Sequence, residues 1–524
     1  MENHFNLVEE PWIPVADVGS VSLRDVFANP HHRSLGGNPV QKIAVLKLLL
    51  AIAQAAETPD DEAAWKTLGA DGLARSCLAY LEQWHDRFYL YGDKPFLQLP
   101  DIRALVESRT AKRLNGLRTE ASIREAKLNG LPRAIGSGIY PDLPSENNTF
   151  LSHTLSCGNL TDAEVAMFIV TLMNFAFGGK RVEADMPSLA GRALGNRYSA
   201  KAGPSLGGWS GQLHCFALSG NIRQDIWLNT ITRQDIVRLN RWSHGLGSPP
   251  WEKYPKSECD DFAVRHKNSY QGCLVALSRF VLLDRSSIYY LDGINYPSVK
   301  EGWFEPSLIL NNSSNEVKVK YVDPDRQPWR ELQSLLSFAE SDHASGFECF
   351  SLRKSIERAR DNIEYVAVWT SGLKVTSNSG DQSVKQSDDF VESVVWLRTA
   401  DLGASFILQL KSEMSRLEVL ANQLHGRVVD FFKEQQVNGK KVGTKIGAQA
   451  THLFWQLCER DFQSLVDHCE VDDESVAMRH RLRKIFAGYA QQAYDRFCPK
   501  ETARQLDAWA KCRPNTHNYL QQEA

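Results

Sequence analysis

Residues 406–431 read FILQLKSEMSRLEVLANQLHGRVVDF, and their pattern sets the architecture of the C-terminal part of the chain. The apolar residues recur at intervals of three and four, which places them on one stripe of an amphipathic helix. They are Phe406, Ile407, Leu410, Met414, Leu417, Leu420, Leu424, Val428 and Phe431. After a Gly/Lys-rich loop at 438–447, further helical patterns cover 448–468, 474–497 and 501–510. Four such helices with short links predict a four-helix bundle over residues 401–524.

Residues 1–400 mix helical and strand patterns, so the predicted fold class is α+β, with an N-terminal globular domain before the bundle. Helices are expected at 40–56, from 60 to about 84, and at 165–177. Strands are expected at 273–283, 287–291, 317–322, 365–369 and 391–397. The segment 371–389 between the last two strands is polar, which is typical of a hairpin tip.

The composition is that of an ordinary globular protein, with 43% hydrophobic and 23% charged residues among 524. The formal net charge of -3 gives no bulk attraction to nucleic acid, so a DNA site would have to be a local basic patch. No signal peptide is recognisable, and the longest apolar stretch, 43–53, is interrupted by Lys47 and too short to span a bilayer. We therefore expect a cytoplasmic protein with no membrane partner.

Motifs for metal binding or catalysis are missing from the sequence. None of the ten cysteines forms a CxxC pair, and the nearest approach to a zinc set is Cys259, His266 and Cys273, so reduced, buried thiols are favoured and no metal or cofactor is expected. No HExxH or GxSxG occurs, and Gly178-Gly179-Lys180 lacks the remaining residues of a phosphate-binding loop. The chain is therefore not expected to be an enzyme, although an active site assembled from distant residues stays open.

Two segments have the character of a nucleic-acid surface. Cations outnumber carboxylates between positions 107 and 133, which predicts one or two basic helices; Lys112, Arg113 and Arg118 are the candidates for non-specific phosphate contacts. Residues 178–211 are rich in glycine and in Lys/Arg, a composition that exposes backbone N–H groups and long cationic side chains rather than forming a core.

Two N-terminal segments carry a family resemblance. Residues 5–15, FNLVEEPWIPV, and residues 85–98, HDRFYLYGDKPFLQ, resemble the opening of the CasA family, the large subunit of the type I-E CRISPR surveillance complex Cascade. The resemblance implies a non-catalytic subunit that recognises the protospacer-adjacent motif (PAM) in double-stranded target DNA. It also implies local duplex opening, R-loop formation with the guide RNA (crRNA) and recruitment of a helicase-nuclease, with the other Cascade subunits as partners.

The resemblance also points to individual residues. A glycine-rich loop that contacts the PAM corresponds to Lys201, Ala202 and Gly203, and Arg279 falls where some members carry a base-reading lysine. Gln382 is the candidate for a wedge at a hairpin tip, with Asn378 as the next choice, and Phe150 for docking the guide-RNA end. The alternatives are an ordinary surface loop, a strand arginine paired with a carboxylate, a plain solvent hairpin and a core phenylalanine. At the level of function they are a hydrolase or transferase, or a purely architectural subunit.

Overall fold

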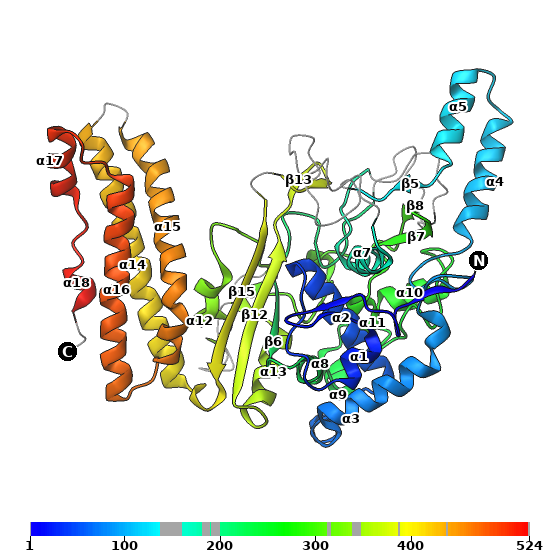
Figure 1. Cartoon of the computed structure of the whole chain (residues 1–524), viewed down its shortest axis with the longest axis horizontal. Helices are drawn as coiled ribbons and strands as arrows, with labels where there is room; N and C mark the ends of the chain where they lie inside the picture. Colours follow the sequence, from blue (N-terminus) through cyan, green and yellow to red (C-terminus); the bar gives the residue numbers. More distant parts are fainter. Residues whose placement is uncertain are drawn as a thin grey trace. The chain divides into compact units, whose positions relative to one another are not determined.

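The computed structural model describes residues 2–136, 160–180, 189, 200–311, 316–337, 347–385, 388–435 and 439–521. They form two compact units, drawn in Figure 1. The N-terminal unit comprises Met1–Pro328, Phe347–Arg358 and Ala367–Val394, and the bundle unit comprises Trp329–Gly346, Ala359–Val366 and Val395–Ala524. Helices and small sheets occur together in this chain, so the predicted α+β class is confirmed.

Helix α2 (Pro39–Ala56) is the central helix of the N-terminal unit. It begins with Pro39 in its first turn and with a capping box between Asn38 and Gln41. It packs against α3 (Glu62–Gln83) and α7 (Asp162–Phe175). By length and composition α2 could cross a membrane, but 78% of it is buried inside the fold, as in the core helix of a globular unit. All three helices lie where the sequence predicts them.

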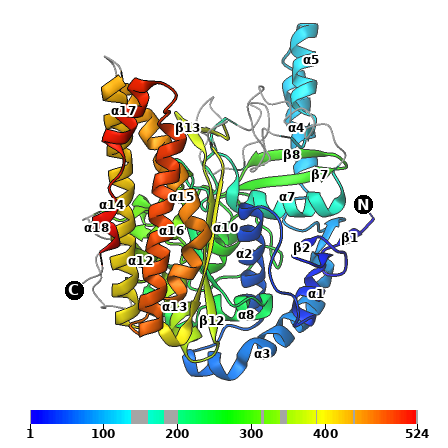
Figure 2. The ribbon, with the colours of Figure 1, turned by 60° about the vertical axis from the view of Figure 1, so that its left-hand side comes forward.

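The remaining helices of the N-terminal unit are short, apart from a pair that extends away from it. They are α1 (Leu23–Ala28), α8 (Ile222–Asn229), α9 (Arg233–Leu239), α10 (Asp261–Lys267), α11 (Tyr270–Leu274) and α13 (Phe350–Arg360, whose last residues belong to the bundle unit). The extended pair is α4 (Ile102–Leu114) and α5 (Glu120–Asn129), which form the basic helical hairpin expected from the sequence (Figures 1 and 2).

The strands form several small sheets. A three-stranded sheet has the order β15 (Phe390–Arg398), β12 (Tyr365–Leu373), β6 (His214–Leu218), and another has β5 (Arg133–Ala134), β8 (Ser287–Asp292), β7 (Arg279–Asp284). In a third three-stranded sheet, β9 (Leu310–Asn311) lies between β10 (Lys318–Val319) and β11 (Phe347–Glu348). The two-stranded sheets pair β1 (His4–Asn6) with β4 (Tyr89–Tyr91), β2 (Ile13–Val15) with β3 (Gly19–Val21), and β13 (Thr376–Asn378) with β14 (Asp381–Ser383).

The strand predicted at 273–283 begins later than expected. Residues 270–274 form α11 instead, because the Ser269 side chain accepts a hydrogen bond from the backbone N–H of Gly272 and caps this turn. Gly272 lies so close to the carbonyl oxygen of His266 that no Cβ would fit. The His266 carbonyl lies outside the apolar run 273–283, so the sequence pattern of that run alone predicts a strand.

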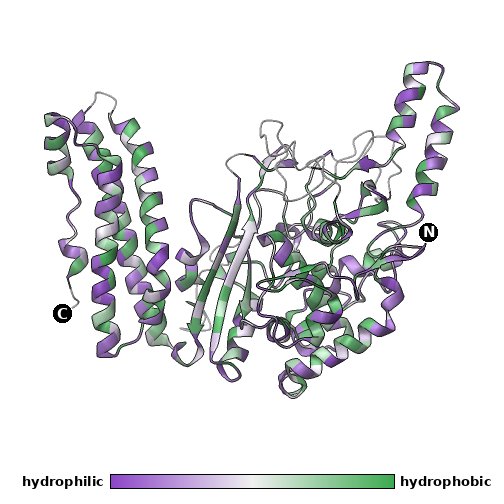
Figure 3. Ribbon diagram, viewed as in Figure 1, coloured by the Kyte–Doolittle hydropathy of each residue, from purple (hydrophilic) through white to green (hydrophobic). Residues whose placement is uncertain are grey.

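The bundle unit contains the predicted four helices: α14 (Ala404–Gln435), α15 (Gly439–Asp467), α16 (Asp473–Phe497) and α17 (Ala503–Cys512). It also contains the short helices α12 (Leu332–Leu335) and α18 (His517–Leu520). Hydrophilic and hydrophobic residues alternate along the helices of this unit (Figure 3), and the stripe from Phe406 to Phe431 is buried as predicted.

The loop predicted at 438–447 is wrong, because α15 begins at Gly439. Gly439, Gly443 and Gly447 recur every four residues on one face of the helix, and all three are buried. A Cβ on Gly443 would come within 2.9 Å of the Cα of Val429, so the glycines let α15 approach α14 closely. Glycine is unfavourable inside an isolated helix, which is why the sequence favours a loop here.

A buried ion pair joins α14 and α16. Glu413 on α14 is 1% exposed and accepts a 3.0 Å hydrogen bond from Nε of Arg483 on α16. Arg479 also lies near this carboxylate, with Nε 3.9 Å from Oε1, while its own guanidinium donates to the carbonyl oxygens of His468 and Glu470. The bundle therefore depends on a charge pair held out of water as well as on its apolar stripe.

Candidate nucleic-acid interface

Three segments that are far apart in the sequence meet in the N-terminal unit. They are residues 177–180 after α7, residues 200–211, and the hairpin β13–β14 (residues 376–383), and we call them together the glycine cluster. Gly179 and Ala200 exchange both of their backbone hydrogen bonds, at 2.9 and 3.1 Å. The Lys180 N–H donates to Asp381 Oδ1 at 2.7 Å, which fixes the hairpin on the first segment.

Glycine is required where the hairpin touches the first segment. Gly179 has a φ of +107°, a region that favours glycine, and a Cβ there would come within 2.7 Å of the Cα of Asp381. A Cβ on Gly178 would lie 3.1 Å from the Ala202 nitrogen and 3.2 Å from the Gly380 oxygen. The backbones of all three segments therefore approach one another more closely than residues with side chains would permit.

Gln382 does not lie at the hairpin tip, so this expectation is wrong. The turn consists of Ser379 and Gly380, both with positive φ as tight hairpin turns require, whereas Gln382 is in β14 and 0% exposed. Its Oε1 accepts from the Gly178 N–H at 2.9 Å, and its Nε2 donates to the Gly207 oxygen at 2.8 Å. A buried amide must be hydrogen-bonded, and these backbone groups satisfy it. Gln382 therefore joins the three segments.

Arg279 is also buried, at 1% exposure, so the expectation that it reaches a DNA base is wrong for this conformation. The Tyr290 hydroxyl accepts from Arg279 Nε at 2.8 Å, and the Lys201 carbonyl accepts from Nη1 at 3.0 Å. The Phe177 carbonyl also accepts from this guanidinium. Arg279 donates hydrogen bonds to carbonyl oxygens of two segments of the glycine cluster, and thereby holds those segments together from the buried side.

The other predicted PAM residues are in or beside the surface of the cluster. Lys201 is exposed, and its Nζ donates to the Tyr296 carbonyl at 3.3 Å, with Glu301 Oε2 at 3.5 Å. Ala202 is half-buried, and Gly203 is buried against the Asn174 carbonyl. Asn378 is exposed and lies next to the hairpin turn.

The sequence interpretation missed Lys180 as a member of this site. Its side chain is exposed, and it follows Gly178-Gly179 at the end of α7. The sequence places Lys180 in the basic, glycine-rich segment 178–211 but does not distinguish it from the other cations there. The structure joins this segment to residues 200–203, so Lys180 and Lys201 both belong to the glycine cluster.

The remaining predicted residues lie elsewhere. Lys112 and Arg118 are exposed and Arg113 is half-buried, and all three belong to α4 or to its connection with α5. Phe150 lies outside the described residues. The α4–α5 hairpin therefore offers cations to solvent, as expected for contacts with phosphates.

A buried polar network lies beneath the second segment. Nζ of Lys47, from α2, donates to Ser205 Oγ at 2.6 Å and to Glu305 Oε1 at 2.5 Å, and Lys47 and Glu305 are 1% and 2% exposed. Burial alone would raise the pKa of Glu305, but the charges of Lys47 and His214 outweigh it and lower this pKa to about 2. The ion pair therefore anchors Ser205 to the core helix.

This network gives a pH prediction. The pKa of Glu305 is lower in the folded chain than the ordinary value of 4.5, so its ionised form stabilises the fold above about pH 4.5, and this contribution is lost as the pH falls towards 2. Between about pH 5 and pH 2 we expect the melting temperature of the wild type to fall more steeply than that of Glu305→Gln, which starts lower at neutral pH because Lys47 loses its partner. Calorimetry measures both, and Glu10→Gln is the control; parallel slopes for wild type and Glu305→Gln would contradict the assignment.

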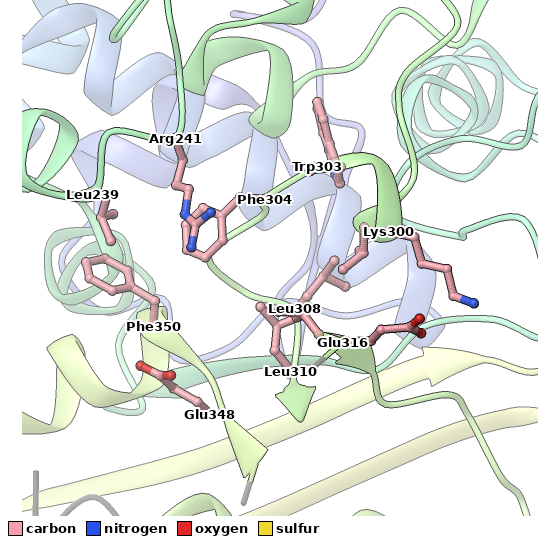
Figure 4. Close-up of a pocket in the computed structure, with 13 residues that line it drawn as sticks. Leu239, Arg241, Lys300, Trp303, Phe304, Leu308, Leu310, Glu316, Glu348 and Phe350 are labelled. Carbon is pink, nitrogen blue, oxygen red and sulfur yellow. The ribbon is translucent and has the colours of Figure 1, made fainter. Parts of the chain in front are cut away.

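A cavity of about 550 Å³ lies in the N-terminal unit (Figure 4). Its lining includes the charged residues Arg241, Lys300, Glu316 and Glu348, and the Arg241 guanidinium lies 5.5 Å from the centroid of the Phe304 ring. The 13 described lining residues include no Ser, Thr, Cys or His. These 13 described residues therefore include no nucleophile–base pair of the kind used in acyl transfer.

The three residues closest to a zinc set do not form one in the described part of the chain, where no group of three potential ligands occurs. Cys273 Sγ accepts from Nε1 of Trp242 at 3.0 Å, and His266 Nε2 lies 2.8 Å from the Val275 carbonyl. Cys259 is exposed. Cys273 and His266 are therefore core residues, and Cys259 is a surface thiol.

A protein-family model and a known protein of the same family both match this chain. The family model described as CRISPR-associated protein Cse1 matches residues 6–494. CasA/Cse1 of Thermus thermophilus is 29% identical over 189 residues, which are 33% of this chain, so the match spans about a third (32%) of that relative's length.

Solved structures share the fold over almost the whole chain. Thermobifida fusca Cse1 has a TM-score of 0.70 at 18% identity and covers 98% of both chains. Thermus thermophilus CasA has a TM-score of 0.69 at 19% identity and covers 99% of both. A chain of a structure titled as a CRISPR RNA-guided surveillance complex has a TM-score of 0.68 at 15% identity, covering 98% of this chain and 99% of that one.

Proposed function

Because the chain belongs to the family of the CRISPR-associated protein Cse1, we propose that it is the large subunit of a type I-E CRISPR RNA-guided surveillance complex. In this role it binds the guide RNA and the other Cascade subunits, recognises the PAM in duplex DNA and opens the first base pairs. The guide RNA then pairs with the target strand and forms an R-loop, after which the subunit recruits a helicase-nuclease. The proposal places this protein in the cytoplasm and gives it no catalytic step of its own.

The observation that carries the proposal is the glycine cluster. Backbone without side chains can enter a narrow minor groove, where the pattern of acceptors is degenerate and close approach does much of the reading. Lys180 and Lys201 supply cations at this surface, and the Asn378 amide can both donate to and accept from base edges. Lys201, Ala202 and Gly203 thus keep their proposed place at the PAM.

Duplex opening requires a rigid element, because unstacking a base step costs a few kcal/mol. The hairpin β13–β14 meets this requirement through Gln382, whose side chain is bonded to two other segments of the cluster. We assign the wedge to the exposed turn at Asn378–Gly380, and assign to Gln382 and Arg279 the positioning of the segments around it. Phe150 keeps its proposed role at the 5′ end of the guide RNA.

A binding experiment separates motif reading from general affinity. The triple variant Lys112→Ala, Arg113→Ala, Arg118→Ala, assembled into the complex, should bind targets with all flanking motifs more weakly, because phosphate contacts carry no sequence information. The slope of log affinity against log salt should fall by about one for each phosphate that the variant no longer neutralises. Affinities for a library of randomised flanking motifs, measured at several salt concentrations, test this expectation.

The control removes three exposed cations elsewhere in the N-terminal unit, Lys66, Arg75 and Lys94, and should leave the salt slope unchanged. A changed motif preference with undiminished general affinity would overturn the assignment of the α4–α5 cations. A wild-type complex that binds every flanking motif equally would overturn the proposed function in favour of an architectural subunit. Nuclease or ATPase activity of the purified chain with divalent metal would favour an enzyme.

A further inference from the structure

Trp209 is the most exposed aromatic side chain among the described large hydrophobic residues, at 61%. It lies in the run Gly207-Gly208-Trp209-Ser210-Gly211, inside the second segment of the glycine cluster. A single exposed apolar residue is common on protein surfaces and by itself indicates nothing. Trp209 differs because its backbone is held rigidly while its indole ring faces solvent.

The backbone on both sides of Trp209 is fixed by the rest of the cluster. Gln382 Nε2 donates to the Gly207 oxygen at 2.8 Å and lies 3.4 Å from the Trp209 oxygen. The Ser210 carbonyl accepts from the Val375 N–H at 3.3 Å. Gly207 and Gly211 have φ values of +76° and +84°, and a Cβ on either would overlap its neighbours. The loop is therefore already ordered before any ligand binds.

The surroundings of the ring suit a nucleobase. The side chain of Lys374 lies beside Ser210, the next residue in the loop, with Nζ 3.1 Å from Ser210 Oγ, and supplies a cation for a phosphate. With Trp209 61% exposed, its ring is accessible to a ligand from solvent. Proteins that bind unpaired bases without sequence preference combine exposed aromatic rings for stacking with nearby cations for the phosphates.

We propose that Trp209 is a stacking platform for one unpaired nucleobase of the target DNA, next to the base pairs that the hairpin opens. This inference rests on the proposed function and adds to it a place for a base that has lost its partner. A rigid loop makes the platform effective, because little conformational entropy is lost when the base stacks.

The test uses the assembled surveillance complex and target duplexes in which single nucleotides near the PAM, on either strand, are replaced by abasic nucleotides. Trp209→Ala should weaken binding of the unmodified target by about 5- to 150-fold, the range found for loss of one base–aromatic stack. Trp209→Phe should retain most of the affinity, because it keeps an aromatic face. At the position of the stacked base, an abasic nucleotide should weaken DNA binding by the wild-type complex by a similar factor. The same nucleotide should not weaken binding by the Trp209→Ala complex any further, because the stack is already lost.

The outcomes are distinct. If Trp209→Ala and every abasic position act additively, no base stacks on this ring and the inference is wrong. If Trp209→Ala prevents assembly of the complex while the isolated chain keeps its melting temperature, the ring contacts a protein subunit and the inference is also wrong. Failure of the wild-type complex to distinguish flanking motifs on unmodified DNA would instead reject the proposed function. Trp396→Ala, at an exposed tryptophan of the bundle unit, is the control.

Discussion

Gly179→Ala is expected to reduce motif-dependent DNA binding at least about a hundredfold, because it separates the hairpin β13–β14 from the rest of the glycine cluster. A Cβ at this position overlaps Asp381, and the φ of +107° is strained for any residue other than glycine. The overlap involves backbone, which cannot rotate away. The affinity of the assembled complex for targets with and without the PAM measures the loss, and the far-UV circular dichroism of the chain should stay unchanged.

Two other glycines of the cluster provide matched controls. Gly380→Ala has a φ of +91° but no atom within 4 Å of the new Cβ, so it strains the proposed wedge turn without separating the segments and should cause a smaller loss. Gly208→Ala has neither strain nor a close neighbour and should bind like the wild type. Equal losses for Gly179→Ala and Gly208→Ala would show that the contact between the segments is not required. Gln382→Glu tests the same contact, because it places a carboxylate oxygen opposite the Gly207 carbonyl.

Glu413→Ala is expected to destabilise the bundle unit by about 3–5 kcal/mol, because it leaves the buried Arg483 charge without its carboxylate. Removing one partner of a buried ion pair costs more than the pair itself contributes, since the remaining charge stays out of water. Hydrogen exchange followed by mass spectrometry should show faster exchange in α14 and α16, with little change in α2 and α7. The exchange rates therefore show where the stability is lost.

The double variant Glu413→Leu, Arg483→Met removes both charges and should recover much of the lost stability, because apolar groups of similar size can replace a buried pair. The exposed pair Lys511–Asp507 on α17 is the control, with both side chains more than 60% exposed; its removal should leave the exchange rates unchanged. If the single and double variants lose equal stability, the loss comes from removing the ion pair itself and not from leaving Arg483 unpaired.

Elements with a strong local pattern could be predicted from the sequence. The apolar stripe of α14 and the capped, apolar helix α2 lie where they were expected, because period and caps are properties of neighbouring residues. The first turns of α15 could not be predicted, since the glycines there serve a contact with α14. The same reason explains α11, whose glycine packs against a carbonyl outside the local run. The division into domains at residue 400 stays a prediction.

For the candidate site, the sequence predicts which segments come together better than it predicts which of their residues are exposed. The glycine-rich loop, Arg279 and the polar hairpin do meet, but Gln382 and Arg279 are buried against backbone groups of the cluster that lie 78 to 204 positions away in the sequence. A polar residue in a polar segment has no local signal that distinguishes exposure from such a contact. Lys180 and Trp209 were missed for a related reason, since only the fold shows that they belong to the cluster.

The long separations within the glycine cluster have a consequence for synthesis of the chain. The Gly178 N–H and the Gln382 side chain that binds it are 204 residues apart, so the ribosome needs roughly 10 to 40 s between them at about 5–20 residues per second. For most of that interval the nascent chain carries both glycine segments without the hairpin that joins them. A polypeptide released early would lack the Gln382 side chain that joins these two segments. Assembly of the glycine cluster must therefore wait until residue 382 has been synthesised.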